Sequence, residues 1–288
     1  MEWIACSLLA AFSVATADAL TKRNLGDLDP YEMGVVRLVF MAPWLLLVLA
    51  FIPRPGLDRT FFVSMMAALP FELAAFVLYM KAIKVSPLSL TLPFLAFTPA
   101  FIILTGRVLL GERITPAGLL GILCIVAGAY SLNLSHAREG VFAPFKAIFR
   151  EKGSRYMLAV SLIFSLTGVL GKIAVLHSDP YFFGVAYYLA FTLLMLAAMP
   201  FVKGAKPGSL LKKPAAGAVI GAVGAVEVFA HMVAISLVQA AYMISLKRTS
   251  IIFGVLYGVW LFKDDKPAER LAGASIMVAG VFLITWFG

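Results

Sequence analysis

Apolar stretches of about twenty residues follow one another along almost the whole chain, separated by short breaks that carry Gly, Pro, Asp or Lys. A helix of roughly 20 apolar residues crosses a hydrocarbon core of about 30 Å. The pattern therefore predicts an all-α, polytopic membrane protein with ten transmembrane helices, at about 3–21, 31–52, 60–83, 87–107, 115–134, 157–176, 181–202, 215–237, 240–262 and 268–287.

One break is longer than the others. Residues 135–156 separate five helices in 1–134 from five in 157–288. Within 141–152 the apolar residues recur at helical spacing and the basic residues occupy other positions, which is typical of a helix in the membrane interface. We expect an interfacial linker there, with a structureless connection as the alternative.

The two halves share short sequences at a nearly constant distance. Asp-Pro-Tyr-x-x-Gly-Val occurs at 29–35 and at 179–185, and 179 − 29 = 150. Two further matches have an offset of 152: 80–83 with 232–235, and 126–128 with 278–280. Because five is odd, a second copy of five helices enters the membrane from the opposite side. The chain is therefore predicted to contain two inverted five-helix repeats, an arrangement that many transporters use for alternating access.

Composition supports a membrane protein and gives no reason to expect a disulfide-rich, metal-binding or nucleic-acid-binding protein. Apolar residues make up 62% of the chain and charged residues 14%, whereas soluble domains are about half apolar and about a quarter charged. The two cysteines, Cys6 and Cys124, lie within apolar stretches, so neither a disulfide framework nor a metal site is expected. The net charge of +9 lies mainly in loops, where it suits anionic lipid headgroups and gives no reason to expect nucleic acid.

The basic residues also indicate an orientation. The loops after the odd-numbered predicted helices hold most of them, namely Lys22, Arg23, Lys81, Lys84, Arg138, Lys146, Arg150, Lys152, Arg155, Lys203, Lys206, Lys212, Lys213, Lys263, Lys266 and Arg270. The opposite side holds Arg54, Arg59, Arg107, Arg113 and Lys172. The positive-inside rule then places both termini outside the cytoplasm.

Ionisable residues at membrane depth are the candidates for function, because a charge there costs at least about 2.5–3.5 kcal/mol unless it is paired or hydrated. They are Asp18, Arg37, Glu72, Glu227, His231, Lys247 and Arg248. Glu227 and His231 are four residues apart and share a helix face. Tyr79 is the repeat counterpart of His231, since 231 − 152 = 79.

We predict a central substrate site formed by Glu227, His231, Lys247 and Arg248, with hydroxyls from Tyr79 and Tyr242. One basic residue would pair with Glu227 and the other would hold a carboxylate or phosphate group. The alternative is that all these charges neutralise one another as fixed pairs between helices.

Other residues receive narrower expectations. Glu72 has no obvious partner in the sequence, so it is a candidate for proton coupling, together with Glu227; the alternative is a protonated side chain that only bonds between helices. Asp18 is expected to be a solvated cap near the end of the first helix. Lys22 and Lys172 are expected to extend to opposite membrane surfaces.

Several segments resemble a known family. Leu-Gly-Glu-Arg-Ile-Thr at 110–115, followed by Gly121 and Val126-Ala127-Gly128, is similar to the end of the EamA repeat of the drug/metabolite transporter superfamily. The segment 82–89 and the prolines at 93 and 99 are also similar, while the second copy is more diverged. The resemblance implies a ten-helix, alternating-access carrier with a central site; in the usual picture of this family the termini are cytoplasmic.

We therefore expect a secondary transporter, an exporter or exchanger, for a small organic metabolite such as an amino acid or organic anion. Proton-coupled efflux of lipophilic or cationic drugs is the alternative, and an intramembrane enzyme or a receptor is a second one. No enzyme motif, cofactor or metal site is apparent in the sequence. The expected setting is a prokaryotic plasma membrane, as a monomer or homodimer, with protons as a possible coupling ion.

Overall fold

The computed structural model describes residues 1–131, 151–202, 204–262 and 267–287, and these residues form helices and no strand. Most of the predicted interfacial segment 141–152 lies outside them. The helices are α1 (Glu2–Leu25), α2 (Pro30–Leu49), α3 (Arg59–Val85), α4 (Leu88–Thr91), η1 (Leu92–Ala96), α5 (Phe97–Leu110), α6 (Pro116–Ser131), α8 (Lys152–Leu176), α9 (Pro180–Ala198), η3 (Met199–Phe201), η4 (Pro207–Ser209), α10 (Pro214–Leu237), α11 (Ala240–Lys247), α12 (Ser250–Phe262) and α13 (Pro267–Phe287).

Six helical segments among the described residues are long and apolar enough to cross a membrane: Glu2–Leu25, Pro30–Leu49, Arg59–Val85, Lys152–Leu176, Pro180–Phe201 and Pro214–Leu237. Shorter apolar helices cover Phe94–Leu110, Pro116–Gly128 and Ser275–Ile284. The chain is therefore an all-helical, polytopic membrane protein.

The two segments predicted as single helices, at 87–107 and 240–262, are each interrupted. In the first, a 3-10 stretch with Pro93 near its start separates α4 from α5, because proline removes a backbone donor. The second segment is interrupted at Arg248 and Thr249, between α11 and α12, although it contains no proline there. Thr249 Oγ1 donates 2.8 Å to the carbonyl of Leu246 at this point. Arg248 corresponds to Ala96, since 248 − 152 = 96, so both repeats break at the same place.

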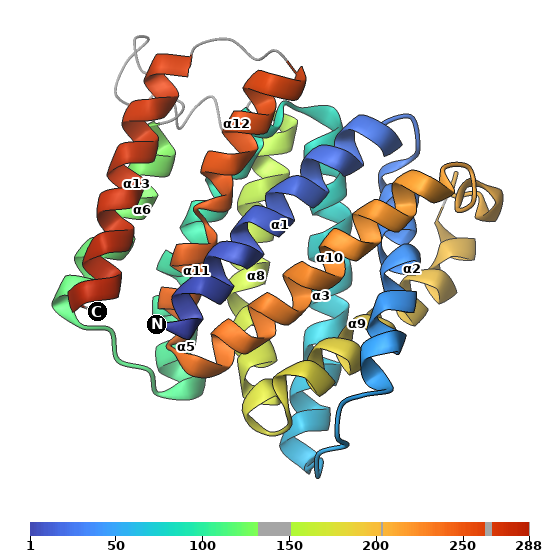
Figure 1. The fold of residues 1–288 in the computed structure, drawn as a ribbon, viewed down its shortest axis with the longest axis horizontal. Coiled ribbons are helices and arrows are strands. Elements are labelled where there is room, and N and C mark those ends of the chain that lie inside the picture. Colours follow the sequence, from blue (N-terminus) through green and yellow to red (C-terminus); the bar gives the residue numbers. More distant parts are fainter. Residues whose placement is uncertain (132–150, 203, 263–266, 288) are drawn as a thin grey trace.

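The most extensive helix contacts between the two halves have counterparts in which the corresponding helices of the halves are exchanged. Helix α3 packs on α8 as α10 packs on α1, and α5 packs on α8 as α12 packs on α1. Figure 1 shows the pair α6 and α13 along one edge, and α2 and α9 toward the other. This exchange is the pattern expected of two repeats related by a twofold axis.

The α6–α13 contact shows the same relation at atomic scale. A Cβ added to Gly121 would lie 2.8 Å from the Gly280 carbonyl oxygen, and one added to Gly128 would lie 2.6 Å from that of Gly273. The residue numbers rise along α6 as they fall along α13, so the two helices are antiparallel. Glycine allows their backbones to touch.

Loop contacts agree with the predicted alternation of sides. At one end, Lys213 Nζ lies 2.6 Å from Asp27 Oδ1, and the amide of Lys206 donates 2.8 Å to Glu32 Oε1. At the other end, His177 Nδ1 lies 2.7 Å from Asp58 Oδ2. Both termini lie at this second end (Figure 1), which we call the terminal end. An even number of crossings gives this arrangement.

Candidate functional site

A cavity of about 140 Å³ lies between the two halves. Its lining comes from α1, α2, α3 and η1 of the first half and from α8, α9, α10, α11 and the first residue of α12 of the second. All the ionisable residues that the sequence singled out at membrane depth contribute to it, namely Asp18, Arg37, Glu72, Glu227, His231, Lys247 and Arg248. Tyr79 lines it as well.

Asp18 is not the solvated cap that the sequence predicted. Helix α1 continues to Leu25, so Asp18 lies well inside it and is 1% exposed. Its carboxylate pairs with Arg37 Nη1 at 2.8 Å and accepts a hydrogen bond from the hydroxyl of Tyr79. Three helices of the first half thus meet in one buried network.

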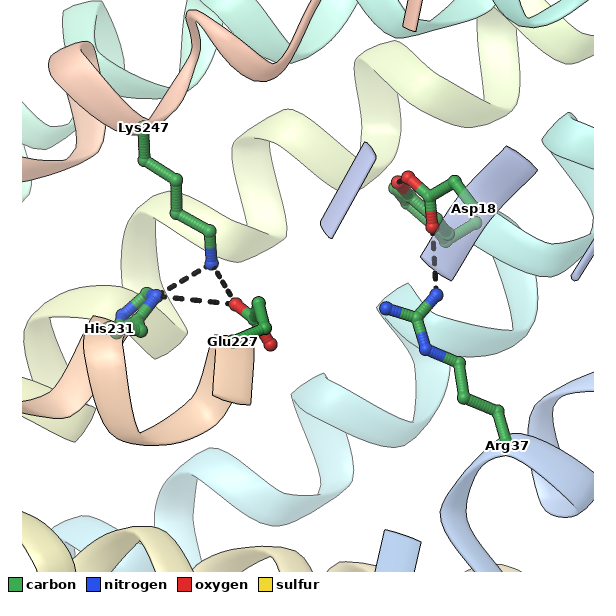
Figure 2. Close-up of polar contacts among 6 residues, drawn as sticks. Asp18, Arg37, Glu227, His231 and Lys247 are labelled. Carbon is green, nitrogen blue, oxygen red and sulfur yellow. Dashed lines mark hydrogen bonds and ion pairs between the residues drawn. The ribbon is translucent and has the colours of Figure 1, made fainter. Parts of the chain in front are cut away.

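The second network belongs to α10 and α11. Lys247 Nζ donates to Glu227 Oε1 and lies 2.6 Å from His231 Nδ1 (Figure 2). An ammonium group has no acceptor, so Nδ1 must accept this hydrogen bond, and the imidazole is then the neutral tautomer protonated at Nε2. The ion pair of this network is therefore Glu227 with Lys247. His231 lies 3.8 Å from Glu227 but adds no charge.

Arg248 lies in the cavity wall without an acidic partner among the described residues. It is 6% exposed, and its Nη2 donates 3.0 Å to Oγ1 of Thr98, which lies in the first turn of α5, just after the helix break of the other half. Its Nε is buried and has no hydrogen-bond partner in the part of the chain that the structure describes. A buried donor left unsatisfied costs about 1–3 kcal/mol, so this guanidinium is suited to an added acceptor.

Glu72 also lines the cavity without forming an ion pair among the described residues. It lies on α3, and the tyrosines Tyr187 and Tyr188 of α9 line the same cavity. Glu72 and Glu227, the two candidates for proton coupling, thus differ, since Glu227 forms an ion pair and Glu72 forms none among the described residues.

Tyr242 is the predicted site residue that does not line the cavity. It lies in the first turn of α11, where its hydroxyl accepts from the amide of Thr115 at 3.1 Å. The ring fills the space beside Gly118. Tyr242 therefore anchors the start of α11 to the loop before α6.

Lys172 does not extend to the surface as predicted, because it is 7% exposed. Its Nζ lies 2.5 Å from Glu112 Oε1 and donates 2.6 Å to the carbonyl of Val238. Lys22 donates to carbonyls as well, at 2.9 Å to Ile83 and 2.6 Å to Ser86. The prediction that the two lysines lie at opposite ends is confirmed.

Sequence reasoning missed the role of Thr98 and the link between Asp18 and Arg37. Thr98 gave no signal, because a lone threonine in an apolar helix is ordinary. From the sequence, Arg37 could extend to the surface or reach an acid on the third predicted helix, and the structure pairs it with Asp18 of α1 instead. Spacing shows which residues share a helix face and leaves open which helices are neighbours.

Comparisons with known proteins agree with this fold. The model of the EamA-like transporter family matches the chain over residues 1–134 and 151–286. Among solved structures, 29 chains match. One of these, described as "Crystal structure of protein", has a TM-score of 0.70 at 15% identity, with 97% of this chain and 96% of that chain covered. At that identity the likeness concerns the fold alone. A comparison with curated proteins gave no match.

The helices, the cavity and the family match together define a membrane transporter. The chain belongs to the EamA-like transporter family, within the drug/metabolite transporter superfamily. This confirms the resemblance drawn from the sequence around Glu112. Members of this family are transporters and not enzymes.

Proposed function

We propose that this protein is a secondary transporter that carries a small anionic metabolite through the central cavity by alternating access. Ten membrane crossings, arranged as two inverted repeats, would open the cavity to each side in turn. The substrate class includes carboxylates, among them amino acids, and phosphate esters. We propose that the protein works as an exporter or as an exchanger.

The observation that carries this proposal is the charge balance of the cavity. Asp18 neutralises Arg37, and Glu227 neutralises Lys247. When Glu72 is protonated, the cavity keeps one positive charge, that of Arg248, whose buried Nε has no acceptor among the described residues. A carboxylate or phosphate oxygen would supply both the charge and the hydrogen bond, and guanidinium groups bind such oxygens in a bidentate manner. Of the two basic residues considered from the sequence, Lys247 is therefore the structural one and Arg248 the ligand-binding one.

Glu72 gives the transporter a means of coupling to protons. A carboxyl group in a cavity, without a cationic partner, changes its charge at a lower cost than one held in an ion pair. We expect the transport rate of the wild-type protein to depend on pH between acidic and neutral values, and that of Glu72→Gln to be flat. A pH profile of Glu72→Gln that matches wild type would remove Glu72 from the coupling step.

A second candidate function is efflux of lipophilic cations. The observation in its favour is that Glu72 shares the cavity with aromatic rings, including Phe76, Phe164 and Tyr187, which can receive a cation on their faces. Loss of cation resistance in Glu227→Gln, with organic-anion transport intact, would support this function over the first.

The test of the proposed function is a thermal-shift screen of the purified protein against organic anions, cations and zwitterions at two pH values. A ligand that binds the folded state at 100 times its Kd stabilises it by about 2.7 kcal/mol. Anions should raise the Tm of wild type and fail to raise that of Arg248→Gln. Stabilisation by cations alone, or equal stabilisation of both proteins by anions, would contradict the proposal.

A further inference from the structure

We propose that Lys172 and Glu112 form a clamp that closes the terminal end of the cavity. The clamp also positions α11, the helix that ends at Lys247 and Arg248. Lys22 is the repeat-related residue at the opposite end. The inference rests on the proposed alternating access. Its evidence is a set of buried contacts that are separate from the ligand site.

The clamp joins four backbone or side-chain groups from both halves. Lys172 of α8 pairs with Glu112 at 2.5 Å and donates to the Val238 carbonyl at the end of α10. Glu112 in turn accepts from the amide of Ala240, the first residue of α11, at 3.0 Å and 3.1 Å through its two oxygens. The Lys172 and Glu112 side chains are only 9% and 11% exposed. Such a pair is held by its hydrogen bonds, and removing either partner leaves a buried charge.

Local backbone geometry brings Glu112 to this position. Helix α5 ends at Gly111, which has a φ of +67°, in the left-handed region that glycine adopts readily. The chain therefore turns sharply, and the amide of Glu112 donates 3.3 Å to the Gly106 carbonyl. The carboxylate is directed from the first half toward α8 and α11 of the second.

The clamp lies directly beyond the cavity on its terminal side. Gly171 is a cavity residue, and Lys172 follows it on α8. Ile235 is a cavity residue on α10, and Val238 comes three residues later. Separating the clamp would therefore open a path from the terminal end to the cavity wall.

The clamp also reaches the ligand site through α11. This helix has eight residues, about 12 Å of length, with Ala240 at its start and Lys247 at its end. Arg248 follows as its C-terminal cap. A movement of Glu112 relative to Lys172 would shift the start of α11, and a helix this short transmits the shift to Lys247 and Arg248. Lys172 and Glu112 are positioning residues in this scheme.

The opposite end repeats part of this design. Lys22 corresponds to Lys172, since 172 − 22 = 150, and Ser86 corresponds to Val238, since 238 − 86 = 152. Lys22 donates 2.6 Å to the Ser86 carbonyl, as Lys172 donates to that of Val238. Lys22 lies one turn beyond the cavity residue Asp18, and Ile83 one turn beyond the cavity residue Tyr79. At each end of the cavity, a lysine thus donates to a carbonyl just before the interrupted helix of its own half.

The experiment measures access to the cavity from each end and needs no ligand. In a background of Cys6→Ala and Cys124→Ala, single cysteines are placed at Ile235→Cys, next to the clamp, or at Leu38→Cys, toward the Lys22 end. Both positions are almost fully buried and line the cavity. The rate of modification by a polar maleimide is measured for each.

Three clamp variants are compared. Glu112→Gln and Lys172→Met alone each leave a buried charge, so both should lower the Tm. The double variant Glu112→Gln/Lys172→Met removes both charges and should regain most of the Tm. In the double variant, modification of Ile235→Cys should be faster by about fivefold or more, with no increase at Leu38→Cys, because the state open to the terminal end gains population.

Lys22→Met provides the mirror experiment, in which Leu38→Cys reacts faster and Ile235→Cys does not. Equal acceleration at both reporters would indicate general loosening and would overturn the clamp. Unchanged rates at both reporters in a folded double variant, or in Lys22→Met if the double variant fails to fold, would also overturn it. Failure of the anion screen would leave these rates unaffected, so the two proposals fail separately.

Discussion

Some charged residues in the cavity stabilise the fold and others can bind a ligand, and whether a residue is paired decides between these two roles. Glu227 and Lys247 satisfy each other, so their main effect is on stability and on the placement of α11 against α10. Arg248 lacks an acidic partner among the described residues and keeps its capacity to bind. Seven ionisable side chains therefore reduce to two with free capacity, Arg248 and Glu72.

The first prediction concerns the Glu227–Lys247 pair. Lys247→Met leaves the Glu227 charge buried and should lower the free energy of unfolding by about 3–5 kcal/mol. Adding Glu227→Gln removes that charge, and the double variant should regain most of the loss. Thermal unfolding in detergent measures both. Equal stability of the single and double variants would show that the pair is not the cause.

A second prediction concerns the pH dependence of stability that arises from Glu151, which caps the start of α8 outside the membrane-spanning segments. Burial by itself raises the pKa of Glu151, but hydrogen bonds from Ser86 Oγ and from the amides of Gly153 and Ser154 outweigh it and lower the pKa below its ordinary value of 4.5. Because the folded-state pKa is depressed, this group stabilises the protein at neutral pH. The contribution is lost as the pH falls below 4.5 and through the folded-state pKa.

The check is the dependence of Tm on pH for wild type and Glu151→Gln. The variant should be less stable at neutral pH, by about 1 kcal/mol for a lost helix cap, and the two proteins should converge in acid. A constant difference at all pH values would show that the charge of Glu151 has no role.

At this scale the sequence allowed part of the site to be predicted. The residues were found because charges in apolar stretches are rare and spacing identifies shared helix faces. The pairing of Glu227 with a basic residue of the next helix was predicted, whereas the Asp18–Arg37 and Arg248–Thr98 contacts were not, because they depend on which helices pack together. Tyr242 was assigned to the site from its residue type, while its position at the start of α11 directs it to Thr115.

Among the elements, the α6–α13 contact and the two broken segments are the most informative. Glycines at corresponding positions of the repeats make the α6–α13 contact, and Gly121 and Gly280 touch through their backbones. The break before Thr249 lies next to Arg248 in the cavity wall, and Arg248 bonds there to Thr98, just after the break of the other half. Non-helical backbone at membrane depth occurs where it lines a cavity.

The third prediction tests the glycine contact. A Cβ at Gly280 would lie 2.6 Å from the Gly121 carbonyl oxygen, so the backbone must move. Gly280→Ala should lower the free energy of unfolding by about 1–3 kcal/mol. Ala127→Leu on the exposed side of α6 is the matched control and should change it little. A neutral Gly280→Ala would mean that the two helices are not in backbone contact.

The helix break near Pro93 was foreseeable, because proline cannot donate within a helix. The break at Arg248 and Thr249 was not, because local sequence there contains no proline or glycine. Thr249 and Ser245 bond to helix carbonyls, and such bonds occur in unbroken helices as well. The repeat offset, applied to Ala96, was the available signal.

For the whole molecule, the exchange of helix contacts between the halves is the property on which the proposed alternating access rests. Five helices per copy predict the twofold relation and the common end of both termini, because the parity of the helix number does not depend on how the helices pack. The ten predicted crossings remain a proposal, since six helical segments of the described residues meet the length and apolar criteria. The positive-inside orientation remains a prediction too.

The central claim is that Arg248 binds an anion that the protein then carries across the membrane. Counterflow in proteoliposomes tests it most directly, with liposomes loaded with unlabelled organic anions and given the same anions in labelled form. We predict that wild type exchanges at least one anion. Arg248→Gln loses a charge-assisted hydrogen bond, so its exchange rate for that anion should be lower by at least about tenfold. Exchange of no anion by wild type, or equal exchange by both proteins, would contradict the account.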